Sequence, residues 1–170
     1  YDYFQQLFAQ VTNPPLDAIR EELITAVSGT LGPRPNILEP SGKNCAQIHL
    51  QHPIITESQL AEILANENRP DSLKAKVLQA TFSKVSGVHG LQDALIKLQE
   101  DAESAIQSGV GILVISDRKS DENNAPIPSL LATGAVHHYL TKARKRGLVG
   151  IVVESGDARE THHMALLLGF

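Results

Sequence analysis

The sequence contains no tryptophan, one cysteine, three tyrosines and four phenylalanines in 170 residues. A single cysteine excludes an internal disulfide framework and any metal or iron–sulfur cage built from several cysteines of this chain. So few aromatic rings argue against a stacking platform for single-stranded nucleic acid. The 15 basic and 19 acidic residues give a net charge of −4, whereas domains that follow nucleic-acid phosphates are usually basic.

Long apolar segments and nucleotide-binding motifs are also missing. No apolar run reaches the roughly 18 residues that a membrane span needs, and the first residues lack the pattern of a signal peptide. The Walker, G-x-G-x-x-G and G-x-S-x-G motifs are absent, so no phosphate cradle or hydrolase nucleophile is predicted. These absences favour a soluble, intracellular, globular protein without nucleic-acid or membrane partners. The length suits one ordinary domain, or one domain and a small additional piece.

The C-terminal third carries the clearest secondary-structure pattern. Residues 110–115 (VGILVI) and 148–153 (LVGIVV) are short, continuous apolar runs, typical of strands that are covered on both faces of a parallel sheet. Helical patterns follow each run, over about 129–146 and 158–168. This strand–helix–strand–helix order predicts an α/β fold with a mostly parallel sheet, flanking helices and right-handed crossovers.

Weaker patterns precede that third. Apolar spacing and capping residues predict helices over about 16–28, 56–66 and 90–107, and residues 47–50 and 74–82 are expected to be strands. Residues 29–47 are rich in Pro, Gly and Asn and are expected to form an extended loop, long enough to suggest a role beyond connection.

The end of the sequence suggests a missing element. The apolar run before Gly169 is typical of a helix that ends at a glycine. In an α/β pattern the next element should be a strand. We therefore expect the 170 residues to be a fragment of a longer polypeptide.

Charged residues follow both apolar strands, where parallel sheets bind ligands. Asp117 and Arg118 come directly after the first strand, and Glu154 follows the second. One interpretation is a polar binding site between the two loops. The other is that Asp117 and Arg118 secure their own loop while Glu154 pairs with a nearby base.

Two histidine doublets, His137-His138 and His162-His163, raise the possibility of a metal site. Adjacent helical residues point about 100° apart, so a doublet chelates poorly, and HExxH is absent. The pattern favours structural or interface histidines, with a metal site as a weaker alternative. Cys45 has no base beside it in the sequence, and a nucleophilic role would need a histidine brought close by the fold.

Four ordered segments resemble one family. The opening YDYFQQLFAQVTNPPLDAIREE and the later runs ILVISDR, APIPSLLATGAVHHYL and VGIVVESGDARETHHMALLLGF are similar to the central domain of the glutamate synthase large subunit. The resemblance covers the first 22 residues and most of 110–170, and it is weaker over 50–90. It implies that residues 1–170 are the later part of this α/β central domain, cut before the synthase barrel.

The resemblance implies a role within a larger oxidoreductase that makes glutamate from glutamine and 2-oxoglutarate. The central domain would link the amidotransferase domain to the barrel that carries FMN and an iron–sulfur cluster, and it would help to wall the ammonia path. Ferredoxin or an NADPH-dependent subunit would supply electrons, and the sequence does not distinguish them. The location implied is cytoplasmic, or plastid for a plant-type source.

The family's nucleophilic cysteine opens its mature chain, whereas this chain opens with Tyr1, and Cys45 lies far inside. No catalytic residue and no bound cofactor are therefore expected in this segment, and alone it should be non-catalytic. The resemblance assigns Thr12 and Asn13, beside two rigid prolines, an ammonia-path or interdomain role. Simple helix capping is the alternative for both.

A second hypothesis is a stand-alone α/β ligand-binding module that uses Asp117, Arg118 and Glu154. An interdomain segment should expose apolar surface where its neighbours were removed. A binding module should instead have an evenly polar surface and a defined pocket at the strand ends.

Overall fold

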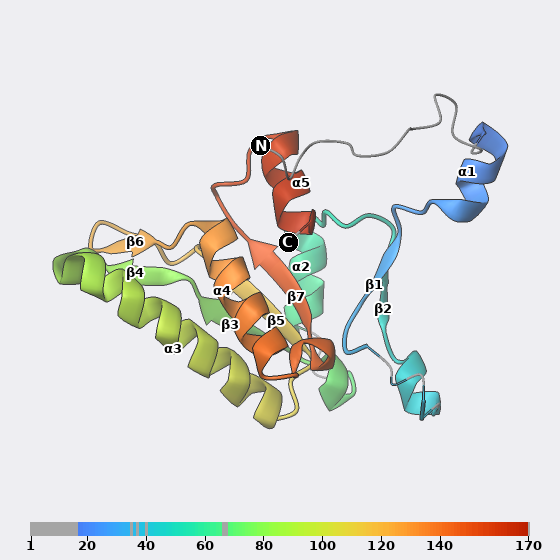
Figure 1. Ribbon diagram of the computed structural model, residues 1–170, viewed down its shortest axis with the longest axis horizontal. Coiled ribbons are helices and arrows are strands. Elements are labelled where there is room, and N and C mark those ends of the chain that lie inside the picture. Colours follow the sequence, from blue (N-terminus) through green and yellow to red (C-terminus); the bar gives the residue numbers. More distant parts are fainter. Residues whose placement is uncertain (1–16, 35, 37, 40, 66–67, 170) are drawn as a thin grey trace, which may run out of the picture.

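The computed structural model describes residues 17–34, 36, 38–39, 41–65 and 68–169. Its centre is a sheet of three parallel strands in the order β3-β5-β7, which span Ala75–Gln79, Ile112–Ser116 and Gly150–Glu154 (Figure 1). The predicted α/β class with a mostly parallel sheet is thereby confirmed. All five residues of the central strand β5 are buried, as its continuous apolar run predicts.

Helices α3 (Gly87–Gln107) and α4 (Ser129–Lys142) cover one face of this sheet (Figure 1). Leu113 and Ile115 of β5 point to that face, where they join a core with Leu98, Ala102 and Val136 from the helices. The last helix, α5 (Thr161–Gly169), packs against α4. The apolar spacing in residues 90–107 therefore corresponds to the buried stripe of α3.

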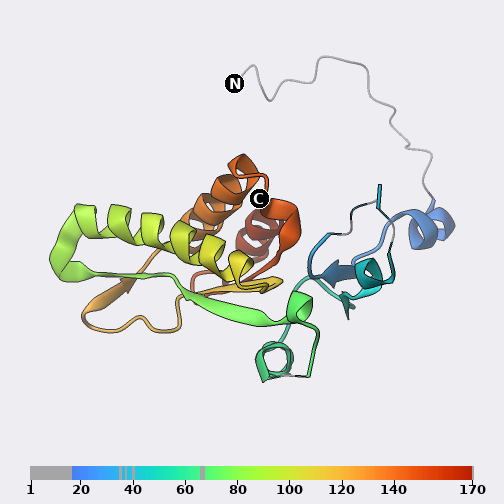
Figure 2. The ribbon, with the colours of Figure 1, turned by 90° about the horizontal axis from the view of Figure 1, so that it is seen from below.

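The opposite face is covered by α2 (Glu57–Ala65) and by an antiparallel pair, β1 (Gly29–Leu31) and β2 (Ile48–Leu50). Figure 2 shows α2 on the other side of the sheet from α3 and α4. Leu31, Leu60 and Ile63 pack there against Ile112 and Val114 of β5. Alternate residues of one strand thus serve two separate cores.

Local capping explains where α1 (Ala18–Ile24) and α2 begin. Asp17 Oδ1 accepts hydrogen bonds from the backbone N–H groups of Ile19 (3.1 Å) and Arg20 (2.8 Å). Ahead of α2, Thr56 N donates to Gln59 Oε1 (2.8 Å) and Gln59 N donates to Thr56 Oγ1 (3.3 Å). This reciprocal pair is the capping box that the sequence predicts.

Several expected boundaries differ in the structure. The segment 74–82, expected to be one strand, forms β3 and part of β4 (Thr81–Ser83). β4 pairs antiparallel with β6 (Asn124–Pro126), which lies between β5 and α4. Residues 29–47, expected as a loop, contain β1 and a short 3-10 helix. The helix α4 stops at Lys142 because Arg144 adopts a left-handed conformation with φ 58°.

One close approach fixes a glycine at the start of β5. A Cβ on Gly111 would lie 1.7 Å from the carbonyl oxygen of Ser72, which belongs to the 3-10 helix Asp71–Leu73 before β3. Only glycine leaves room for that carbonyl. Among the helices of the described ranges, none is both long and apolar enough to span a membrane.

Candidate functional site

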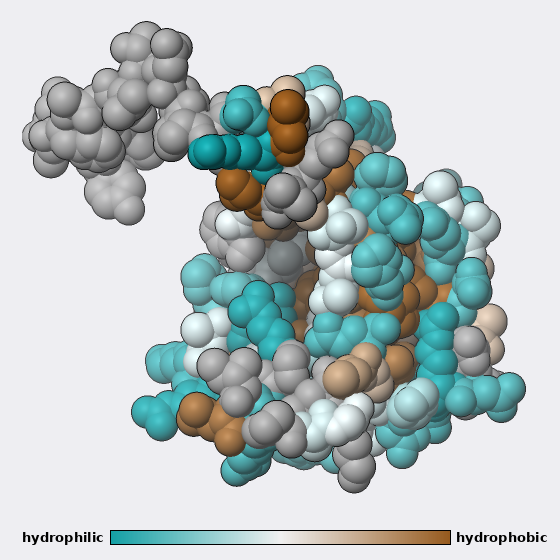
Figure 3. Space-filling view, turned by 90° about the vertical axis from the view of Figure 1, so that its right-hand side faces the viewer, coloured by the Kyte–Doolittle hydropathy of each residue, from teal (hydrophilic) through white to brown (hydrophobic). Residues whose placement is uncertain are grey.

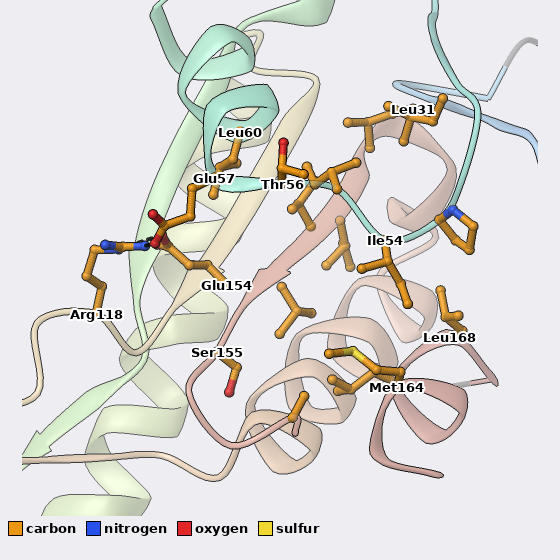
Figure 4. Close-up of a pocket in the computed structure, with 18 residues that line it drawn as sticks. Leu31, Ile54, Thr56, Glu57, Leu60, Arg118, Glu154, Ser155, Met164 and Leu168 are labelled. Atoms are coloured by element: carbon orange, nitrogen blue, oxygen red, sulfur yellow. Dashed lines mark hydrogen bonds and ion pairs between the residues drawn. The ribbon is translucent and has the colours of Figure 1, made fainter. Parts of the chain in front are cut away.

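The candidate site lies at the carboxyl ends of β5 and β7 (Figure 4). Because Ser116 pairs in register with Glu154, the residues that follow β5 are held beside the end of β7. The N–H of Asp117 donates to the Glu154 carbonyl oxygen (3.2 Å). The fold thus brings together all three of the charged residues that the sequence singled out here: Asp117, Arg118 and Glu154.

Glu154 is the centre of this cluster. Its Oε1 accepts a hydrogen bond from Arg118 Nε (2.6 Å), and its Oε2 accepts one from Ser116 Oγ (2.5 Å). The Glu154 side chain is only 20% exposed, and Ser116 is buried. Both carboxylate oxygens are therefore occupied by donors from the neighbouring strand end. The Ser116 hydroxyl also accepts from the Arg118 backbone N–H (3.2 Å).

Arg118 joins this cluster to α2 on the second face of the sheet. Its Nη2 lies 2.5 Å from Glu57 Oε1, in the first turn of α2. The hydrogen bond and charge of Arg118 hold the pKa of Glu57 below its usual value. The two carboxylates, Glu57 first, raise the pKa of Arg118 further. A single guanidinium thus connects three elements that are distant in sequence.

Asp117 secures the loop that leads from β7 to α5. Its carboxylate accepts hydrogen bonds from Ser155 Oγ (2.9 Å) and from Gly156 N (2.9 Å). The Ser155 hydroxyl accepts in turn from the backbone N–H of Asp157 (3.0 Å). The second sequence-based interpretation expects Asp117 to secure its own loop, but its carboxylate holds the neighbouring one. Glu154 pairs with a nearby base, Arg118, as that interpretation expects.

Three participants were not among the candidate residues named from the sequence: Ser116, Glu57 and Ser155. Ser116 carried a usable signal, because it is the polar residue that ends an otherwise apolar buried strand. Glu57 carried none, since it lies 61 positions from Arg118 and only the fold brings them together.

An apolar pocket of about 340 Å³ adjoins the charged cluster. Its walls come from β7, α2, α5 and residues 53–56, and Arg118, Glu154 and Ser155 lie at one end (Figure 4). Met164 and Leu168 of α5 form another part of the lining, together with Ile54. The pocket therefore offers an apolar surface with charge at one end, and the charged groups are already paired with one another.

The histidine doublets occupy different settings. His137 Nδ1 accepts a hydrogen bond from Arg146 Nε (3.1 Å), so that nitrogen carries no proton. Burial, and then the charge of Arg146, lower the pKa of His137 below its usual value. The His138 ring meets the His137 ring edge-on with centroids 5.2 Å apart, while His163 Nδ1 lies 3.4 Å from the Arg159 backbone N–H.

No group of three or more His, Cys, Asp or Glu residues within the described part of the chain is arranged to hold a metal ion. Cys45 is exposed at the end of a short 3-10 helix, Gly42–Cys45. Thr12 and Asn13 lie outside the described residues, and their role stays a prediction.

A second polar cluster, unnoticed in the sequence, joins α3 to α4 and its C-terminal loop. The Glu103 carboxylate accepts hydrogen bonds from the Tyr139 hydroxyl and from Lys145 Nζ. These two donors, Lys145 first, hold the pKa of Glu103 below its usual value of 4.5. The cluster links the two helices that cover one face of the sheet.

Comparisons with known proteins agree on one family. The family model described as the glutamate synthase central domain matches residues 1–170. Glutamate synthase (NADPH) large chain of Bacillus subtilis is 43% identical over 170 residues, and glutamate synthase (NADH) of Schizosaccharomyces pombe is 42% identical over 172. Ferredoxin-dependent glutamate synthase 1 of Arabidopsis thaliana is 41% identical over 173 residues. Each match takes in 100% of this chain, which spans only 11%, 8% and 10% of these relatives, respectively.

Proposed function

We propose that this chain, which belongs to the glutamate synthase central domain family, connects two domains of a full-length enzyme of that kind and forms part of the wall of its ammonia path. It links the amidotransferase domain, which releases ammonia from glutamine, to the synthase barrel, which adds that nitrogen to 2-oxoglutarate. FMN and the iron–sulfur cluster are held by the barrel, and ferredoxin or a nicotinamide-dependent partner supplies the electrons. The reacting groups belong to those neighbouring domains.

The exposed apolar surface is the observation that carries the linking role. Leu38 and Val85 are 85% and 93% exposed, and Ile19 and Val27 are 79% and 70% exposed. Figure 3 shows apolar surface among hydrophilic patches on one side of the molecule. A neighbouring domain that packs on these side chains would remove them from water, which favours the linking role.

The outer surface of α3 and α4 adds a second apolar region. A groove there is lined by Gln99, Leu131, Ala135 and His138 among others, and Leu131 is 43% exposed. Ile96 of α3 is 47% exposed. We expect a neighbouring domain to rest on this groove.

The strand-end cluster supports a role in enclosing the ammonia path. Ammonia becomes protonated when it escapes into water, so a wall must stay closed during each turnover. Arg118 fastens α2 to β7, and Asp117 fastens the loop after β7, so that edge of the sheet is cross-linked. We propose an ammonia-path or interdomain role for Thr12 and Asn13, which lie outside the described residues.

Replacing Thr12 by valine in a full-length enzyme tests this function. Thr12→Val keeps the side-chain shape and removes the hydroxyl, so we expect ammonia to escape and the ratio of ammonia released to glutamate formed to rise severalfold. The measurement is that ratio at saturating glutamine and 2-oxoglutarate. Thr30→Val, at an exposed position in β1, is the matched control. A ratio equal to that of the control variant would contradict the role of Thr12.

The alternative, a stand-alone ligand-binding module, has the pocket beside the strand ends in its favour. It requires Asp117, Arg118 and Glu154 to be available to a ligand. All three are instead engaged with protein partners at 2.5–3.2 Å. The contacts therefore support the domain-linking role better than the ligand-binding module.

A further inference from the structure

The strand β7 has an open edge. Among the described residues it pairs with β5 alone. The Gly150 N–H donates to the Gly111 carbonyl (2.9 Å), and the Glu154 carbonyl accepts from Asp117 N–H (3.2 Å). In a parallel ladder alternate residues point their backbone groups to the same neighbour. The backbone N–H and C=O groups of Gly150, Val152 and Glu154 therefore point to β5. Those of Ile151 and Val153 point the other way, to the open edge.

That edge lies in an apolar setting. The side chains of residues 151–153 line the 340 Å³ pocket, as do Met164, Leu167 and Leu168 of α5. Every residue of β7 is only half-buried, whereas every residue of β5 is buried. No residue of α5 is fully buried, although this helix contains the run Met164–Leu168. Outward backbone groups beside apolar walls favour an occupant that brings its own backbone partners.

The winding of the chain indicates which edge of the sheet would receive another strand. The chain runs from β3 through α3 to β5, then through α4 to β7, and it moves one position across the sheet each time. The helices α3 and α4 share one face, and α5 packs beside α4. A crossover of the same hand through α5 leads to the position beyond β7. Within the part of the chain that the structure describes, the outer edge of β3 is unpaired as well, but the winding leads away from it.

We propose that the open edge of β7 binds a fourth parallel strand, supplied by residues that follow α5 in a polypeptide of the relatives' length. The relatives are far longer than this chain, which spans only 8–11% of those compared above. The strand carries apolar side chains on both faces, since it enters the space between α5 and residues 53–55. Its backbone pairs with Ile151 and Val153. The inference rests on this chain being part of a longer polypeptide.

Amide hydrogen exchange in the full-length enzyme tests the proposal without any substitution. We expect the amides of Ile151 and Val153 to exchange at least about a hundredfold more slowly than an exposed amide, and to be about as protected as Val152. The first residues after α5 should show similar protection. Fast exchange at Ile151 and Val153, with Val152 protected, would overturn the proposal.

The same experiment separates the possible occupants. Protection at Ile151 and Val153, combined with fast exchange throughout the segment after α5, would mean that another part of the chain or a second copy covers this edge. Protection that rises with protein concentration would identify the second copy. Either result would overturn the assignment to the following strand.

A proline variant provides an independent check. Val153→Pro removes an outward N–H, a change that an edge strand tolerates but a paired strand does not. We expect exchange in the segment after α5 to become at least about tenfold faster, with the glutaminase activity of the amidotransferase domain retained. Gln79→Pro, which removes an outward N–H on the opposite edge, should leave that segment unchanged. Since neither readout involves ammonia transfer, failure here leaves the Thr12 test intact, and the reverse also holds.

Discussion

At the residue scale, the strand-end cluster shows how one carboxylate organises several elements. Glu154 accepts from both Arg118 and Ser116, and it is shielded from water more than Glu57, whose side chain is 81% exposed. Hydrogen bonds to a charged group are stronger when water competes less for it. The two acidic partners of Arg118 should therefore contribute unequally to stability.

Glu154→Gln should lower the free energy of unfolding by about 1–2 kcal/mol, because it weakens a charge-assisted pair and disturbs the buried Ser116 hydroxyl. Glu57→Gln is the matched variant and should have a smaller effect, since an exposed ion pair is well screened. Urea denaturation at neutral pH measures both. Equal losses for the two variants would show that burial does not set the strength of these contacts.

At the element scale, the pairing of α3 with α4 depends partly on a charged group. Glu103 on α3 accepts from Tyr139 on α4 and from Lys145 just beyond it. Because these donors lower the pKa of Glu103 in the folded protein, the unfolded chain takes up the proton first as the pH falls. The stabilisation is therefore complete above the ordinary pKa of 4.5 and is lost as the pH falls through the lower, folded value.

Comparison with Glu103→Gln tests this linkage. We expect the unmodified protein to be more stable than the variant at neutral pH, with a difference that stays constant down to about pH 6 and shrinks below about pH 4.5. Denaturation at a series of pH values measures the difference. Glu62→Gln, at an exposed position on α2, is the matched control variant. A difference that persists unchanged in acid would contradict the assigned pKa direction.

The individual helices and strands also show which elements sequence patterns can predict. The runs 110–115 and 148–153 predicted β5 and β7, and the apolar spacing over 90–107 predicted α3, because each pattern reflects burial along a single segment. The pairing of β4 with β6 was not predicted. Its three-residue strands are too short to show a period, and they form because the fold brings residues 81–83 and 124–126 together.

At the scale of the whole molecule, the exposed apolar surface should matter only in the longer protein. Leu131→Gln changes a side chain that is already 43% exposed, so the unfolding free energy of the 170-residue chain should change by no more than about 0.5 kcal/mol. In a full-length enzyme, where we expect a neighbour to cover the groove, proteolysis within this domain should become about fivefold faster, as a loss of about 1 kcal/mol implies.

Lys97→Gln, on the exposed surface of α3, is the control for that measurement. It replaces one polar side chain by another and should leave proteolysis of the full-length enzyme unchanged. Equal rates for Leu131→Gln and the control would show that nothing covers this groove in the complete protein.

The sequence by itself determined the α/β class, the buried strands and the family, because apolar runs and long ordered motifs are properties of contiguous residues. It also placed Asp117, Arg118 and Glu154 at strand ends, since parallel strands finish at a common edge. Only the tertiary structure decided what these residues contact. The Arg118–Glu57 pair and the Glu103 cluster join side chains 36 to 61 positions apart. No local sequence pattern indicates contacts between residues so far apart. They form only when the helices pack on the sheet.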